Sequence, residues 1–376
     1  MRLPVIALVV LMCGPAVALE GTGNAVADGL LRAVEAAGYA DARAQSVSRE
    51  GPNTIVTAIT AGEAGGKSIA IARALIEEGV VDADNRLAAT TITYEHITLS
   101  DGRGGNSSAN VVLRGPHLGA SGENRAITAL LGDFDALAVN ALTARTASGQ
   151  SVALEALTVT IAAQDRPGVA AGTLTMEGLV LGPDLMDAAL AGRLRALGYD
   201  TLDLDFAASG AWEAATGAAS LEGARLAMAG MGAVELEGAA TGLTRETYRA
   251  LSTTGVEFAA LLEVMGNVSF NALMVAYEDD GLVPRLLDAG AAQAGIDREA
   301  FAARLVGLLP GALAGLGDGA FTQMVVDNVE GFLADPGRIA VRASPAAGVS
   351  ALQVISAATL NPQLLPELLS ITIEQR

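Results

Sequence analysis

The sequence has a single cysteine, Cys13, among 376 residues, and this residue falls within the expected leader described below. The rest of the chain therefore offers no disulfide, no thiolate zinc site and no catalytic cysteine. Aromatic residues are also scarce, at 3% of the chain. The hydrophobic content of 51% is enough for a large core, which has to be built mainly from Ala, Leu and Val.

Positive charge is in short supply, with 23 Lys and Arg against 42 Asp and Glu and a net charge of −19. Such an acidic chain repels nucleic acid and anionic lipid headgroups at long range, so we expect no nucleic-acid partner. Long apolar runs are lacking too. The longest one after the leader, residues 301–316, contains Arg304 and Pro310, and we expect no transmembrane anchor after signal cleavage.

The N-terminus has the pattern of a secretory signal peptide. Met1-Arg2 is followed by an apolar run to Met12 and then by an A-x-A ending at Ala18. We expect cleavage after residue 18 and a periplasmic location. A lipoprotein attached through Cys13 is the alternative, but Met12 is larger than the small residue that usually precedes a lipid-modified cysteine.

Residues 200–243 give the clearest structural signal. Leu202, Leu204 and Phe206 alternate with Asp203 and Asp205, which predicts a half-buried strand with its aspartates on the polar face. The pattern resumes beyond residues 212–217, which are small and polar and predict a hairpin loop. The stretch predicts three or four antiparallel strands with one apolar face.

The rest of the chain predicts an α+β, mainly β fold: a long curved antiparallel sheet, or meander, with helices concentrated in the C-terminal part. Further strands are expected at 53–60, 68–76, 87–99, 109–118, 124–145 (where 126–138 is open to a helix), 151–162, 172–181, 267–277, 338–343 and 369–374. Helices are expected at 24–38, at 184–197, from Gly281 to about Ala294, after Asp297 and at 320–334, whereas 245–265 is ambiguous. After the signal peptide at 1–18, we expect a β-rich region at 19–244 and an α+β region at 245–376.

Five glutamates recur late in alternating strands, and Gly or Ala follows four of them: Glu95, Glu155, Glu177, Glu222 and Glu237. Their spacing is irregular, which does not fit a solenoid. We interpret them as outer residues of a reused sheet unit that bends at the small residue. A functional row would require all five to be aligned on one edge.

The sharpest chemical motif is AGEAGGKS at residues 61–68, a relaxed phosphate-loop pattern in which Lys67 would contact phosphate and Ser68 magnesium. The flanking segments alternate like an antiparallel pair, so we expect a Gly-rich hairpin turn instead. His96 and His117 are the only histidines, and a metal site or a Ser-His-Asp triad would need one of them. The acidic clusters at 82–85 and 278–280 lack calcium-loop spacing and predict turn or helix-start charges.

Three segments resemble known envelope proteins. The meander has an L-x-L-x-F strand, a W-x-x-x-T-G turn and an L-E-G-A-x-L continuation, and it resembles the repetitive strands of AsmA-like periplasmic proteins. Residues 273–295 and 332–345 are similar to C-terminal segments of uncharacterised secreted alphaproteobacterial proteins. The resemblance implies an envelope protein with a long curved sheet whose inner face can be apolar, and in larger relatives such grooves are linked to lipid handling.

These observations assign no catalytic, cofactor-binding or metal-binding residue. We expect a non-enzymatic periplasmic protein that holds a lipid or another apolar ligand on a concave sheet face. The alternative is a structural or protein-interaction module of the envelope, whose sheet face its own helices fill. A hydrolase comes third, since the chain has no G-x-S-x-G elbow. An open rather than covered apolar sheet face would distinguish the first from the second.

Overall fold

The computed structural model describes residues 21–62, 66–119, 131, 133–163, 169–182, 185–247 and 266–376. The expected leader and Cys13 lie outside this range. The chain forms two compact units. Unit 1 comprises Met1–Ile161 and Thr175–Met186, and unit 2 comprises Ala162–Leu174 and Asp187–Arg376. The compositional boundary expected near residue 244 falls inside unit 2.

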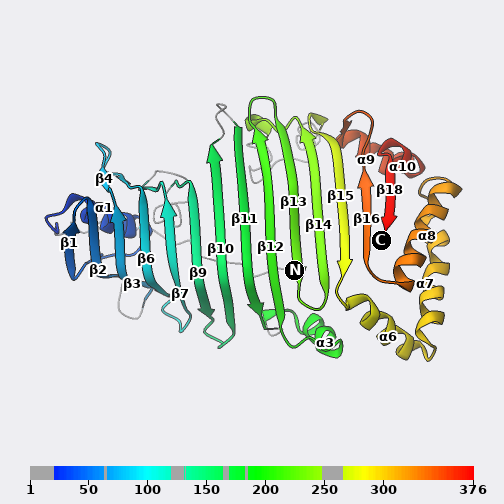
Figure 1. The fold of residues 1–376 in the computed structure, drawn as a ribbon, viewed down its shortest axis with the longest axis horizontal. Coiled ribbons are helices and arrows are strands. Elements are labelled where there is room, and N and C mark those ends of the chain that lie inside the picture. Colours follow the sequence, from blue (N-terminus) through cyan, green and yellow to red (C-terminus); the bar gives the residue numbers. More distant parts are fainter. Residues whose placement is uncertain are drawn as a thin grey trace. The chain divides into compact units, whose positions relative to one another are not determined.

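The strands form a long antiparallel sheet, as Figure 1 shows, and the predicted α+β, mainly β class is confirmed. Fifteen strands belong to it, in the order β1-β2-β3-β6-β7-β9-β10-β11-β12-β13-β14-β15-β16-β18, with β17 paired to β15. Most neighbours in this order are also consecutive along the chain, which is the meander that the alternating segments predict.

Unit 1 holds the first part of the sheet and the helix α1. Its strands are β1 (Ser46–Glu50), β2 (Asn53–Gly62), β3 (Ser68–Glu77), β6 (Thr91–Ser100), β7 (Asn106–Arg114), β9 (Ala136–Arg145), most of β10 (Ser151–Ala163) and part of β11 (Val169–Leu181). A small second sheet is made by β4 (Val80–Val81), β5 (Leu87–Ala88) and β8 (His117–Leu118).

Helix α1 (Ala25–Ala36) closes one face of unit 1. Asn24 caps it by accepting hydrogen bonds from the backbone N–H groups of Val26 and Ala27. Its apolar side packs against β2, β4 and β5, and side chains such as Leu30 and Leu31 are completely buried. The helix predicted at 24–38 is thus confirmed, and it supplies the centre of the unit 1 core.

Unit 2 holds the rest of the sheet and most of the helices. Its strands are β12 (Leu202–Glu213), β13 (Ala218–Met228), β14 (Gly232–Thr241), β15 (Ser269–Asp279), β16 (Arg338–Ala343), β17 (Val349–Ser350) and β18 (Ile371–Gln375). Its helices are α3 (Ala188–Ala196), α6 (Leu282–Ala294), α7 (Arg298–Leu313), α8 (Gly319–Ala334), α9 (Ala351–Leu360), the 3-10 turn η2 (Pro362–Leu364) and α10 (Leu365–Leu368).

The predicted boundaries of α6 and α7 are confirmed by their caps, whereas the helix predicted at 184–197 begins only at Ala188, after the capping residue Asp187. Gly295 ends α6 with a φ of 67°, a left-handed conformation that glycine adopts without strain. Asp297 begins α7 by accepting a hydrogen bond from the backbone N–H of Ala300. The three-stranded meander at 200–243 is confirmed as well, with Asp203 and Asp205 exposed on β12.

Several boundary predictions are wrong. Trp212 and Glu213 extend β12 instead of starting a loop, because both pair with the first residues of β13. The strand predicted at 87–99 divides into β5 and β6, and the one at 109–118 divides into β7 and β8. Of 124–145, only 136–145 is a strand, and residues 120–130 and 132 lie outside the described range.

Several elements have no counterpart in the predictions, among them the polar strand β1 and the helix α9. Strand β1 lacks an apolar face, and prolines flank α9, so neither has the apolar period that marks a strand or a helix. The ambiguous segment 245–265 lies mostly outside the described residues, which resume at Gly266. In the part of the chain that is described, no helix is long and apolar enough to cross a bilayer.

Candidate apolar binding face

The strands of unit 2 align apolar side chains in rows across one face of the sheet. One row places Leu236 of β14 opposite Val275 of β15, and Val275 opposite Val341 of β16. The next row places Gly238 opposite Leu273, and a third places Val234 opposite Tyr277. Because opposite residues of antiparallel strands point to the same face, these side chains form one surface.

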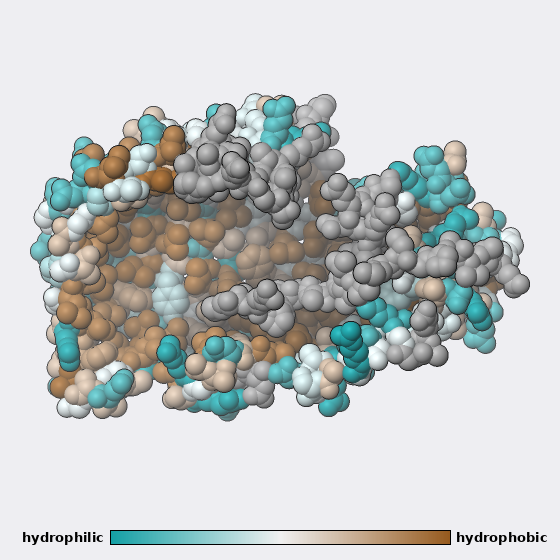
Figure 2. Space-filling model, turned by 180° about the vertical axis from the view of Figure 1, so that it is seen from behind, coloured by the Kyte–Doolittle hydropathy of each residue, from teal (hydrophilic) through white to brown (hydrophobic). Residues whose placement is uncertain are grey.

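Six large side chains on this surface are exposed, by 37–44% each. We call them the apolar floor: Val234, Leu236, Phe270, Leu273, Val275 and Val341. In Figure 2, which views the molecule from behind, apolar residues form a continuous expanse over β14 to β16. Exposed apolar side chains scattered singly are ordinary, whereas contiguous apolar patches are found where ligands, membranes or partner proteins bind.

A β-bulge keeps Phe270 on the floor. The register shifts between Ala239 and Ala240, so that Ala272 pairs with Ala239 and Phe270 with Ala240, and Asn271 is skipped. Without the extra residue, strict alternation would place Phe270 on the opposite face from Leu273. The bulge therefore extends the apolar floor to the beginning of β15.

Helix α8 borders the floor at the other end of β15. The ring of Phe332 packs edge-on against the ring of Tyr277, with the centroids 6.1 Å apart. The single proton of the Tyr277 hydroxyl is shared between two acceptors, the backbone oxygen of Met231 at 2.7 Å and Asp279 Oδ1 at 2.9 Å. Burial and the Asp279 carboxylate raise the pKa of Tyr277, which keeps the ring neutral and fixed at this border.

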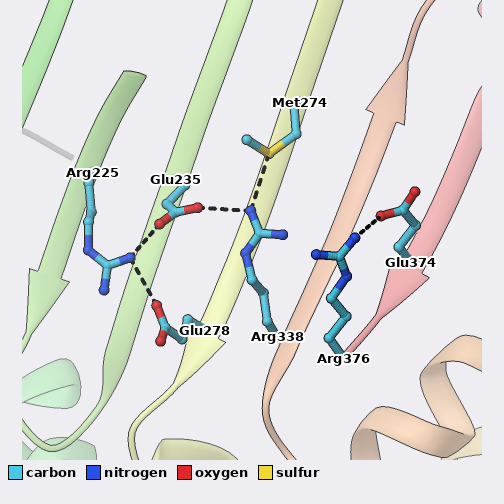
Figure 3. A network of polar contacts seen from close by, with 7 residues as sticks. All are labelled: Arg225, Glu235, Met274, Glu278, Arg338, Glu374 and Arg376. Atoms are coloured by element: carbon cyan, nitrogen blue, oxygen red, sulfur yellow. Dashed lines mark hydrogen bonds and ion pairs between the residues drawn. The ribbon is translucent and has the colours of Figure 1, made fainter. Parts of the chain in front are cut away.

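The opposite face of the same strands is closed by charge. Arg225 contacts both Glu235 and Glu278, and Glu235 also accepts a hydrogen bond from Arg338 at 2.9 Å (Figure 3). Beneath these side chains, Met274 is only 3% exposed. The two arginines, Arg338 foremost, lower the pKa of Glu235 and so hold its carboxylate in the charged form.

Unit 1, taken by itself, covers the apolar face of its strands. Ile71 of β3, Ile92 of β6 and Leu113 of β7 are exposed by 1% or less and belong to the core cluster that includes α1. Both units use alternating strands with one apolar face, yet only in unit 1 do helix α1 and the small sheet bury it. Within unit 1 an apolar strand face is covered, and within unit 2 the apolar floor on β14 to β16 is exposed.

The glycine-rich motif at 61–68 joins two antiparallel strands. Gly62, the last residue of β2, lies opposite Ser68, the first residue of β3, as the hairpin prediction requires. Gly62 has a φ of 110°, and a β-carbon there would lie 2.2 Å from the backbone oxygen of Lys67. This close approach of the two strands requires glycine at position 62, so the glycine needs no phosphate ligand to explain it. Residues 63–65 of the motif lie outside the described range.

The two histidines serve local structure. His96 lies at a register shift in β6 with a φ of 50°, and its backbone N–H donates to Asn110 Oδ1. His117 lies in β8, with Nδ1 3.2 Å from the backbone oxygen of Gly115. Within the described ranges, no three His, Cys, Asp or Glu side chains come together as a metal site would require.

The acidic clusters are turn and helix-start charges, as predicted. Asp82 Oδ1 accepts hydrogen bonds from the backbone N–H groups of Asp84 and Arg86, which closes the turn between β4 and β5. Asp279 accepts from the backbone N–H groups of Gly281 and Val283 at the start of α6. Both clusters therefore use their carboxylates to satisfy backbone donors.

The five recurring glutamates lie on five different strands: Glu95 on β6, Glu155 on β10, Glu177 on β11, Glu222 on β13 and Glu237 on β14. Glu95 forms an ion pair with Arg73 on β3, with a distance of 2.5 Å. Glu95 and Glu222 fall at register shifts, and Gly178, which follows Glu177, has a φ of 63°. Strand irregularities thus accompany at least three of them, in keeping with the bending interpretation.

A comparison with protein-family models gives a match over part of the chain. The model of a family described as an uncharacterized protein matches residues 225–376, which include the floor strands β14 to β16. No curated protein matches the chain.

Proposed function

We propose that this chain binds an apolar ligand, such as the acyl chain of a lipid, on the apolar floor of unit 2. The observation that carries the proposal is the contiguous exposure of six large apolar side chains in register across β14, β15 and β16. An apolar ligand that covers such an exposed strand face removes apolar surface from water, which lowers the free energy.

The composition of the floor limits the ligand. The side chains of its six defining residues contain only carbon and hydrogen, and the ion pairs of these strands lie on the other face. Two small residues of β14, Gly238 and Ala240, lie opposite Leu273 and Phe270 of the floor. The proposal therefore concerns a long apolar chain and includes no catalytic step or cofactor.

The proposal includes the location expected from the N-terminal sequence. A leader at residues 1–18 would deliver the protein to the periplasm, where acyl chains need a carrier in water. The alternative role is a structural or protein-interaction module of the cell envelope. The observation in favour of this alternative is unit 1, where the sheet face is filled by the protein itself.

Native mass spectrometry of protein purified from the periplasm tests the proposal. We expect a co-purifying lipid, or stoichiometric uptake from an envelope extract. Val275→Asp places a charge at the centre of the floor and should abolish uptake. Val80→Asp is the matched control, because Val80 is an exposed valine in unit 1, and it should bind normally. A wild-type protein that takes up nothing would leave the interaction module as the better hypothesis.

A further inference from the structure

The segment that follows the floor is free of charge. Residues 343–366 contain no Asp, Glu, Lys or Arg, although charged residues make up 17% of the whole chain. This segment forms β17, α9 and η2. The whole chain has a net charge of −19, so an uncharged segment of this length stands apart from the rest. Such a segment is suited to a neutral partner and not to a charged one.

The same segment exposes its large apolar side chains. Leu360 is 83% exposed, the highest value of any large apolar residue described, and Leu352, Ile355 and Leu364 are each exposed by more than two fifths. Leu352 and Ile355 are three residues apart and share one side of α9. A capping box at Ser350 and Gln353 holds the helix in place, so that its apolar residues are presented on an ordered element.

Helix α9 starts where the apolar floor ends. Val349 of β17 pairs with Phe270 of the floor, and the backbone N–H of Ala351 donates to the backbone oxygen of Val268. Figure 1 shows α9 at the end of β15 and β16 that is remote from α6. The floor and the start of α9 therefore adjoin each other at Phe270.

We propose that α9 and η2 dock on the surface of an uncharged, zwitterionic lipid bilayer, and that an apolar ligand passes between this bilayer and the floor at Phe270. This inference rests on the proposed function. With ten residues, α9 is about 15 Å long and too short to cross a bilayer, so it lies at the interface. Helices that bind anionic membranes carry Lys or Arg on their polar face, and α9 has neither.

Co-sedimentation of the full chain with phosphatidylcholine vesicles tests this docking. Leu360→Glu should weaken vesicle binding at least tenfold. Leu308→Glu is the matched control, since Leu308 is an exposed leucine on α7, and it should bind as the wild type does. Addition of phosphatidylglycerol should weaken binding, because the chain is acidic.

The outcomes separate docking from ligand binding. Leu360→Glu should still bind a soluble acyl-chain probe in the absence of vesicles, and Val275→Asp should still sediment with vesicles. Equal vesicle binding by wild type and Leu360→Glu would overturn the inference but leave the proposed function intact. A wild type that fails to bind vesicles, and self-associates in a way that Leu360→Glu abolishes, would assign α9 to a second copy instead.

Discussion

Two adjacent residues of β15 allow the openness of the floor to be measured. Met274 faces the closed side of the sheet and is 3% exposed, whereas Val275 belongs to the floor and is 41% exposed. Truncation of a buried methionine to alanine lowers the free energy of unfolding by about 2–5 kcal/mol, and the small cluster around Met274 places Met274→Ala near the lower end.

Val275→Ala should lower the free energy of unfolding by less than Met274→Ala does. It removes two methyl groups, each contributing about 0.8 kcal/mol when fully buried, and partial exposure reduces the expected loss to about 1 kcal/mol. Urea unfolding followed by the fluorescence of Trp212 gives both values. Trp212 is the single tryptophan and lies in unit 2, so it reports the unit that contains both substitutions. Equal losses for the two variants, at unchanged m-values, would mean that the floor is covered and would refute the reasoning.

Two further predictions concern buried and paired polar groups. The Tyr94 hydroxyl is buried without a hydrogen-bond partner among the described residues, so Tyr94→Phe should leave stability unchanged or raise it by up to about 1 kcal/mol. Burial raises the pKa of Tyr94, so the folded state disfavours its ionisation and the wild type loses stability as pH rises above the ordinary tyrosine pKa. The variant should therefore lose less stability than the wild type above about pH 10 in urea titrations. The pKa of Glu235 is lowered, so its ion pairs stabilise the fold above the ordinary carboxylate pKa, and this stabilisation is lost as pH falls. Glu235→Gln should therefore lower the free energy of unfolding by about 1 kcal/mol at pH 7 and by little at pH 3. Glu237→Gln, on the same strand, is its control and should cost less at pH 7.

Alternating sequence was sufficient to predict most of the sheet. Leu202, Leu204 and Phe206 define β12 because each strand residue points to the face opposite its neighbours. Helix ends were predictable where a single residue decides them, as Gly295 and Asp297 do. Strand β1 was missed because its polar sequence has no apolar period, and it is held in the sheet only by pairing with β2.

The exposure of the floor could not be predicted from sequence. The alternation at 267–277 resembles the alternation at 68–76. The apolar residues of 68–76 are buried in the core cluster that includes α1 and the small sheet, whereas several of those at 267–277 are exposed. Whether a face is covered depends on how elements distant in sequence pack against it. The apolar period of a strand does not encode this packing. The shift that brings Phe270 onto the floor was also hidden, because a bulge depends on the partner strand.

Quenching of Trp212 by brominated acyl chains tests the central claim most directly. Trp212 pairs with Ala219 on β13, Ala219 with Ala240 on β14, and Ala240 with Phe270, so the indole shares the row of the sheet that ends at the floor. We predict saturable quenching by a dibrominated acyl chain, lost in Val275→Asp and retained in Val80→Asp. Acyl-chain binding without quenching of Trp212, or with equal quenching in Val275→Asp, would contradict a binding site on the apolar floor.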